Sequence, residues 1–273
     1  MISSGIFAVV SGLLALVSPV GVVVDQVVAD NFRSRLHRVE QLQVRIDNAP
    51  SYQVAQGRVD RLRLASRGAW LIPELRLDTL ELETDPINLD ISRLSGNLSG
   101  NLSGATETPS LASSLLPPGL LQTPLGAGIR VVVTETDIQQ ALQSPRVQSL
   151  IKEIASGFLG SEAATIEIIP QIKFLPEHRF QLQIDLQTPN NPPIKIDLIS
   201  GITVLDGSQF NLESPVLMIN DSPLPSSVIT GISRVFLDRF DLKNLESNGI
   251  TLRLLQLQIN PDQVEIAAFV SIK

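Results

Sequence analysis

The chain has 273 residues, of which 43% are hydrophobic and only 4% aromatic, so its apolar content is mainly Leu, Ile and Val. It contains no cysteine, which excludes disulfides, thiolate catalysis and cysteine-ligated metals. The net charge of −7 argues against general nucleic-acid binding, which requires a basic surface.

The N-terminal segment is strongly apolar. Ile6 to Val24 is a run of 19 residues without a charge, close to the minimum length that spans a bilayer. Pro19 and several glycines interrupt it, and it lacks both the basic leader and the clear cleavage site of an ordinary signal peptide. Residues 1–24 are therefore predicted to target the chain to a membrane. An anchor or uncleaved leader is favoured over a cleaved signal, and a buried helix is the third alternative.

The next segment predicts a helix followed by strands. Apolar residues recur at helical spacing from about Val20 to Arg38. Alternating apolar residues then predict strands around residues 42–46, 62–64 and 75–82. The last of these changes phase, which predicts a β-bulge near Asp78 and Thr79.

A segment rich in Ser, Gly and Pro, Ser95 to Gly128, is predicted to be a loop. Residues 129–133 read as a strand that leads into a helix, because Thr134 and Asp137 have the spacing of a capping box. Ser144 and Pro145 then start a second amphipathic helix that extends to about Phe158.

From Thr165 onward the pattern is mainly that of strands with one apolar face. Period-two alternation covers residues 166–186, 194–204 and 210–218, and Asp206-Gly207 predicts a hairpin turn. A helix is predicted from about Pro225 to Phe240, with Val228 and Ile232 facing inward. Two final strands cover residues 250–254 and 264–272.

These elements predict an α+β fold: a single domain over residues 25–273, in which a long twisted antiparallel sheet wraps amphipathic helices. Such a sheet can enclose either a filled core or an aliphatic cavity. Periodicity alone does not separate these two outcomes.

No pattern of catalytic chemistry is present. The two histidines, His37 and His178, lie in no motif, and no nucleophile-elbow, zinc-protease, phosphate-loop or calcium-loop pattern occurs. The sequence therefore predicts a protein that is not an enzyme, with no catalytic residue, no metal and no cofactor.

Arginines are concentrated in one part of the chain. Between Asp30 and Arg76 there are nine arginines and five acidic residues, which gives this segment a charge of +4. Guanidinium groups suit bidentate contacts with phosphate oxygens. A phospholipid headgroup is accordingly predicted to contact four of them, Arg58, Arg61, Arg63 and Arg67. The alternative interpretation is a solvated strand face, whose arginines pair with Asp47, Asp60, Asp78 and Glu81.

Three segments carry a resemblance to a known family. VRIDNAPSYQVAQGRVDRLRLASRG (Val44 to Gly68), ELETDPINLD (Glu81 to Asp90) and VVVTETDIQQAL (Val131 to Leu142) resemble the bacterial LmeA-like phospholipid-binding family. The resemblance implies an envelope-associated protein on the periplasmic side of the membrane, with a fold similar to tubular (BPI-like) lipid-binding proteins. It brings no catalytic residues with it.

The sequence thus predicts a membrane-associated protein that binds phospholipid, with arginines near the headgroup and acyl chains in an aliphatic groove. The helix residues predicted to contact the chains are Leu150, Ile154, Phe158, Val228, Ile232 and Phe236. The alternative is a structural or interaction protein of the membrane surface, with a filled core and no ligand. Neither interpretation predicts a nucleic acid or a particular protein as partner.

Overall fold

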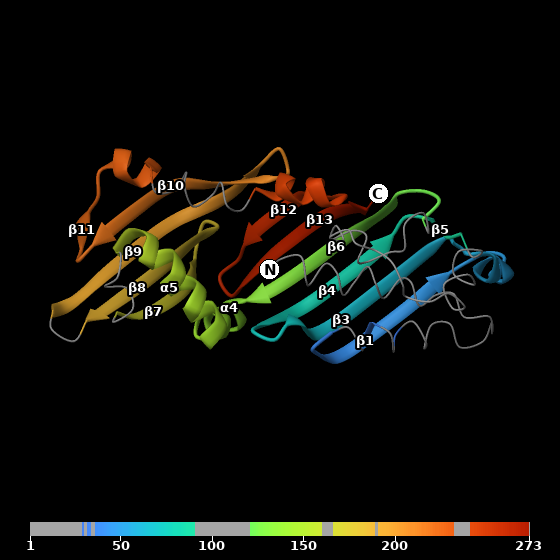
Figure 1. Ribbon diagram of the computed structural model, residues 1–273, viewed down its shortest axis with the longest axis horizontal. Coiled ribbons are helices and arrows are strands. Elements are labelled where there is room, and N and C mark those ends of the chain that lie inside the picture. The colour runs from blue at the N-terminus through green and yellow to red at the C-terminus, as the bar shows by residue number, and fades with distance from the viewer. Residues whose placement is uncertain are drawn as a thin grey trace, which may run out of the picture.

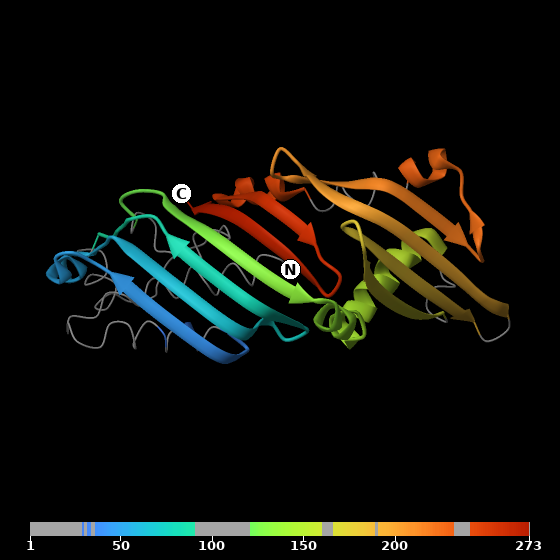
Figure 2. The ribbon, with the colours of Figure 1, turned by 180° about the vertical axis from the view of Figure 1, so that it is seen from behind.

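The computed structural model describes residues 29, 32–33, 36–90, 121–159, 166–188, 191–231 and 241–272. The predicted targeting segment, residues 1–24, and most of the predicted loop at 95–128 lie outside these ranges. Within them no helix has both the length and the apolar character needed to cross a membrane. The molecule is elongated, with two antiparallel sheets that follow one another along its long axis (Figures 1 and 2).

The first sheet has six strands in the order β1-β3-β4-β6-β13-β12, so the last two strands of the chain pair beside β6. Its strands are β1 (Arg38–Asp47), β3 (Arg61–Ile72), β4 (Leu75–Thr84), β6 (Leu125–Thr134), β12 (Ile250–Ile259) and β13 (Gln263–Ile272). A small separate sheet pairs β2 (Arg58–Val59) with β5 (Ile87–Asn88), after the 3-10 helix η2 (Ser51–Gln56).

The second sheet has five strands in the order β11-β10-β9-β8-β7. They are β7 (Glu167–Leu175), β8 (Arg179–Thr188), β9 (Asn191–Leu205), β10 (Gln209–Ile219) and β11 (Ser222–Pro223). The strands therefore divide between two main sheets where the sequence predicted one. The division arises because α4 (Glu135–Leu142) and α5 (Pro145–Leu159) follow β6, whereas β12 and β13 return to the first sheet.

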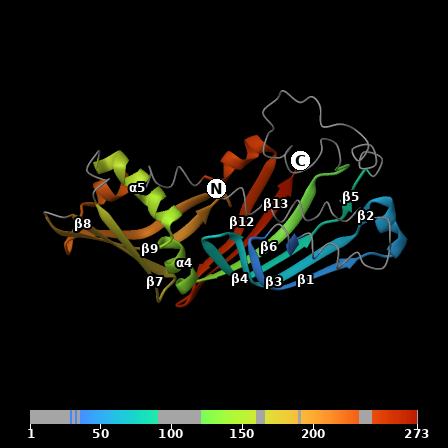
Figure 3. The same cartoon turned by 60° about the horizontal axis from the view of Figure 1, so that its bottom comes forward.

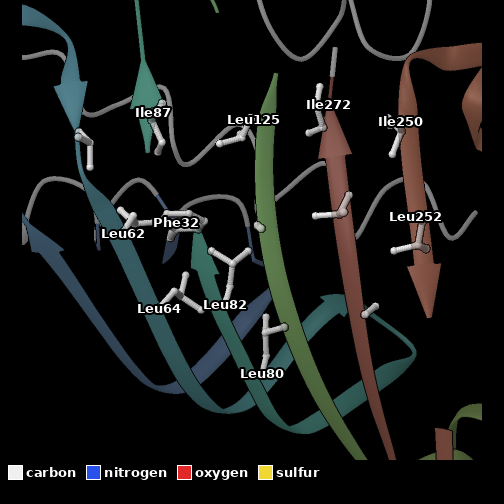
Figure 4. Packing of buried hydrophobic residues seen from close by; sticks show 14 of the residues in the cluster. Phe32, Leu62, Leu64, Leu80, Leu82, Ile87, Leu125, Ile250, Leu252 and Ile272 are labelled. Atoms are coloured by element: carbon white, nitrogen blue, oxygen red, sulfur yellow. The ribbon is translucent and has the colours of Figure 1, made fainter. Parts of the chain in front are cut away.

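The core of the first sheet follows from strict alternation. In β3 the residues Leu62 and Leu64 are 0% and 3% exposed, whereas Arg61 and Arg63 between and beside them are exposed. Phe32 lies over Leu62, Leu64 and Leu82 and is itself 1% exposed (Figure 4). Leu80, Leu125, Val270, Ile272, Ile250 and Leu252 extend the same buried cluster across the sheet. This half of the molecule has a filled core.

Several predicted features are confirmed and others are corrected. The hairpin at Asp206-Gly207 is present, and both residues have the positive φ angles, 51° and 67°, that such a turn requires. The strand predicted at 129–133 begins earlier, at Leu125, so the end predicted for the loop at 95–128 is wrong. The first residues of β6 form a strand because they pair with β13.

The bulge predicted near Asp78 and Thr79 is wrong, because the β3–β4 register is continuous there and shifts instead between Trp70 and Ile72. The strand is regular, and Leu77 and Leu80 lie on its opposite faces. The apolar pattern of the sequence changes phase between them because both are buried, at 4% and 2% exposure.

Helix α4 connects the two sheets. Its N-terminus is capped as predicted: the Asp137 N–H donates to Thr134 Oγ1 over 3.1 Å. Its side chains then pair with the free edge of β7. Gln139 accepts from the Ile172 N–H (2.8 Å) and donates to the Pro170 carbonyl (3.1 Å). Glu135 accepts from the Phe174 N–H (2.6 Å). The edge of the second sheet is therefore satisfied by a helix that follows directly from the first.

A second connection comes from the β9–β10 hairpin. The Gly207 carbonyl accepts from the Leu254 N–H of β12 over 2.7 Å. The Ser208 carbonyl accepts from the Leu242 N–H at the start of the 3-10 helix η4 (Leu242–Asn248) over 3.0 Å. Helix α4 and this hairpin thus both join the two sheets.

Candidate functional site

One face of the five-stranded sheet is aliphatic. Cross-strand register aligns Ile172, Leu182, Leu198 and Leu217 in one row across β7, β8, β9 and β10. The next two rows along the strands contain Pro170, Ile184, Ile196 and Ile219, followed by Ile168, Leu186 and Ile194. Successive side chains of a strand point to opposite faces, so all of these residues face the same side.

This aliphatic face is only partly covered. At β7 it is well buried, with Ile168 at 3% and Phe174 at 8% exposure, but on β9 the side chain of Ile194 is 41% exposed. On β8 the aliphatic residues Leu182, Ile184 and Leu186 are half-buried, the same class as Gln181, Gln183 and Asp185 on the opposite face. A filled core buries its apolar face far more than its polar face. Here the two faces of β8 do not differ in that way.

Helix α5 lies over one face of this sheet (Figures 1 and 3). Helix α5 contacts β7, and the buried residues of β7 belong to the aliphatic face. Leu150, one of the predicted acyl-chain residues, is half-buried on α5. The side chains of Ile154 and Phe158 lie outside the described residues, as do Ile232 and Phe236 entirely.

Val228 lies in the helical residues 226–231 and is 42% exposed, whereas its neighbour Ile229 is 7% exposed. The inward position predicted for Val228 is therefore wrong at this turn. Helical spacing alone predicted a buried face that includes Val228, whereas the buried residue is the next one, Ile229.

The four predicted headgroup arginines belong to the other half of the molecule. Arg61, Arg63 and Arg67 are exposed on the face of β3 opposite Leu62 and Leu64, and Arg58 is exposed on β2. The structure thus brings three of them onto one face. That face belongs to the six-stranded sheet, while α5 contacts the five-stranded sheet. Among the described residues, the predicted headgroup arginines and the predicted acyl-chain residue Leu150 therefore lie in different halves of the molecule.

Most charges on this outer face are paired. Arg63 lies 3.4 Å from Asp47 and 3.3 Å from Glu83, and Arg61 lies 3.2 Å from Glu83. The predicted alternative of arginines paired with strand carboxylates is confirmed for Asp47 and Asp78, which pairs with Arg76, while Glu81 pairs with Arg130. Asp60 instead accepts a hydrogen bond from the Ala49 N–H. Within the described part of the chain, Arg58 and Arg67 form no ion pair.

A second ion-paired group lies beside the first. Arg130 Nε donates to Glu265 over 2.5 Å, and its Nη1 donates to Glu81 over 3.3 Å. The hydrogen bond from Arg130 lowers the pKa of Glu265, and the same bond is the main cause that raises the pKa of Arg130. Glu265 therefore keeps its negative charge well below neutral pH, and Arg130 keeps its positive charge well above neutral pH.

An open depression of about 520 Å³ lies on the outer face of the six-stranded sheet. Arg63 is the one predicted headgroup residue that lines it. Its other outer-face lining residues are Gln43, Arg45, Ala65, Glu81, Glu83, Gly128, Arg130, Leu255 and Ala267. Leu255 protrudes because the β12–β13 register shifts between Leu254 and Gln256, and it is 71% exposed.

Sequence reasoning missed two groups of residues. The first is the aliphatic face itself: its alternation was recognised, but a period of two does not show whether anything covers the face. The second consists of Glu83 and Arg130, the partners of Arg63 and Glu81, because a cross-strand partner in a sheet depends on the register. Within the described ranges no group of His, Asp and Glu residues is arranged to hold a metal ion.

Comparison with known proteins supports one family. No curated protein and no solved structure matches the chain significantly. The family model for LmeA-like phospholipid-binding proteins matches residues 17–269, nearly the whole chain. The chain belongs to the LmeA-like phospholipid-binding family.

Proposed function

We propose that this protein binds phospholipid without chemically transforming it, and that the acyl chains lie on the aliphatic face of the five-stranded sheet, beside α5. The family supports phospholipid binding and membrane association. The observation that carries the location is that Leu182, Ile184 and Leu186 are only half-buried, and an acyl chain would cover the part that remains exposed. Burial of this hydrocarbon against hydrocarbon supplies a favourable free energy of about 25 cal/mol per Å².

The six-stranded sheet is the less suitable half for acyl chains. Its inner face already packs against Phe32, and Leu62, Leu82 and Ile272 are at most 3% exposed. An acyl chain would have to displace these contacts. The first half of the molecule therefore has a filled core, while the second half offers a partly covered aliphatic surface.

Leu150, the predicted acyl-chain residue of α5 whose side chain is described, supports this location because it lies on the helix that contacts β7. Ile154, Phe158, Ile232 and Phe236 remain predictions for the same surface. The arginines remain predicted headgroup contacts, but Arg61, Arg63 and Arg67 lie on the outer face of the other sheet and Arg58 lies on β2. Three further predictions stay part of this proposal. They are a tubular, BPI-like arrangement, a single domain over residues 25–273, and a location on the periplasmic side of the membrane.

A Trp substitution tests the acyl-chain surface. Leu182→Trp places a bulky ring on the aliphatic face, whereas Gln183→Trp places the same ring on the opposite face of the same strand. The protein is purified, and native mass spectrometry with lipid extraction gives the amount of phospholipid per chain. We expect Leu182→Trp to carry less than half the lipid of the parent, and Gln183→Trp to carry the parental amount.

Stability separates a blocked surface from an overpacked core. On an open face Leu182→Trp changes the free energy of unfolding little, whereas overpacking a filled core costs about 1–3 kcal/mol. A parent protein that carries no phospholipid, together with a strongly destabilised Leu182→Trp variant, would contradict the proposal.

A further inference from the structure

The depression on the outer face has an unusual distribution of side-chain sizes. Two neighbouring cross-strand rows form it. The first contains Gln43, Ala65, Glu81, Arg130 and Ala267, and the second contains Arg45, Arg63, Glu83 and Gly128. Ala65, Gly128 and Ala267 alternate with long charged residues, so the small residues form a floor and the charged side chains form its walls.

The floor has room above it. A Cβ atom added to Gly128 would approach no atom closer than the Glu83 carbonyl oxygen at 4.0 Å. Leu255, 71% exposed, adds an apolar wall beside Ala267. An exposed Leu next to an uncharged floor is a suitable contact for the carbon atoms of a ligand rather than for its charges.

The charged side chains of the walls, taken together with their ion-pair partners, sum to a net charge of zero. Arg45, Arg61, Arg63 and Arg130 pair with Asp47, Glu81, Glu83 and Glu265. The carboxylates Glu81 and Glu83 lie on β4, between Arg63 on β3 and Arg130 on β6. None of these four arginines lies on β4 itself. Neighbouring strands are about 4.8 Å apart, so Glu83 lies one strand spacing from Arg63, and Glu81 lies one strand spacing from Arg130.

We propose that this outer face docks on a membrane surface and that its depression receives zwitterionic phospholipid headgroups, each with a phosphate and a primary ammonium group. The proposal rests on the proposed function for membrane contact and adds the surface and headgroup class. The phosphate contacts the guanidinium groups of Arg63 and Arg130, and the ammonium donates to Glu81 and Glu83. Two methylene groups separate these charges in the headgroup, a span comparable with the strand spacing of about 4.8 Å.

The charge balance favours this occupant over a purely anionic one. An anionic headgroup would gain from the arginines but would meet Glu81 and Glu83, with side-chain exposures of 49% and 52%, at the same surface. A headgroup with both charges satisfies both. A quaternary ammonium carries no N–H group and cannot donate hydrogen bonds to the carboxylates.

Vesicle binding tests the proposal with the full-length protein. Three vesicle types are compared: phosphatidylcholine alone, phosphatidylcholine with phosphatidylethanolamine, and phosphatidylcholine with phosphatidylglycerol. We expect phosphatidylethanolamine to strengthen binding about threefold over phosphatidylcholine alone, because each exposed charged contact contributes modestly. Equal binding to these two vesicle types, or stronger binding to phosphatidylglycerol than to phosphatidylethanolamine, would overturn the proposal.

A variant that removes two negative charges should change binding to phosphatidylethanolamine and to phosphatidylglycerol vesicles in opposite directions. Glu81→Gln with Glu83→Gln should abolish the preference for phosphatidylethanolamine. The same variant leaves Arg63 and Arg130 without these partners, so it should bind phosphatidylglycerol vesicles at least about fivefold more tightly. The matched control, Glu167→Gln with Glu213→Gln, changes the net charge equally on exposed residues of the five-stranded sheet. It should leave the phosphatidylethanolamine preference intact.

The same experiment distinguishes this proposal from the acyl-chain proposal. Leu182→Trp should reduce carried lipid and retain the phosphatidylethanolamine preference, because the two surfaces lie on different sheets. A preference that survives in the Glu81→Gln, Glu83→Gln variant would overturn the docking assignment, whatever the lipid content of the purified protein.

Discussion

Arg76 binds carboxylates from three parts of the chain. Its Nη1 atom lies 3.4 Å from Asp78 on its own strand and 3.2 Å from Asp137 on α4, and its Nη2 atom lies 3.4 Å from Glu40 on β1. The guanidinium also lies 5.7 Å from the centre of the Trp70 ring. The hydrogen bond with Glu40 is the main cause that raises the pKa of Arg76. This one side chain therefore holds α4 against the first sheet.

Replacement of Arg76 by Met should destabilise the protein. The Asp137 side chain is only 6% exposed, so loss of the guanidinium leaves a buried carboxylate without its cation. We expect a loss of about 2 kcal/mol in the free energy of unfolding, measured by urea denaturation. Arg67→Met, an exposed substitution on the neighbouring strand, should cost less than about 0.5 kcal/mol. Equal stability of the two variants would contradict the assigned role of Arg76.

Residue-scale features were predictable where they are local in sequence. The spacing of Thr134 and Asp137 predicted the helix cap, and the dipeptide Asp206-Gly207 predicted its turn. The partners of Arg63 and Arg130 were not predictable in the same way. They lie on neighbouring strands, and Glu265 is far from Arg130 in sequence, so their identity depends on the register.

At the scale of elements, α4 replaces a strand at the edge of β7. Its side chains bond to backbone groups of Pro170, Ile172 and Phe174, alternate residues along that edge. A free edge exposes unpaired backbone groups to other chains, and a covering helix removes that hazard. The capping-box spacing of Thr134 and Asp137 predicted the helix. It did not predict that polar residues of the helix pair with a strand edge.

Gln139→Ala should therefore expose this edge. The substitution removes the acceptor of the Ile172 N–H and the donor to the Pro170 carbonyl, and should cost about 1–3 kcal/mol. Amide hydrogen exchange at Ile172 should also become faster. Gln140→Ala changes an exposed residue of the same helix, so it should leave both stability and exchange close to those of the parent. Unchanged exchange at Ile172 in Gln139→Ala would show that α4 does not protect this edge.

At the scale of the whole molecule, the two sheets offer different surfaces. The six-stranded sheet buries one face in a filled core and carries paired charges on the other. The five-stranded sheet has an aliphatic face that α5 covers only in part. Alternation in the sequence predicted an apolar face for the strands of both sheets. It could not show which face is filled, because cover comes from segments far away in the chain, such as Phe32 and α5.

Photocrosslinking is the most direct test of the central claim, that acyl chains lie on the aliphatic face of the five-stranded sheet. A phospholipid with a photoreactive group in its acyl chain is bound to the purified protein, irradiated and mapped by trypsin digestion and mass spectrometry. Cleavage after Arg179, Lys195 and Arg234 gives peptides 180–195 and 196–234, which contain β8, β9 and β10. We predict crosslinks in these two peptides. Crosslinks confined to peptides of the six-stranded sheet, such as 77–93 or 254–273, would contradict the account.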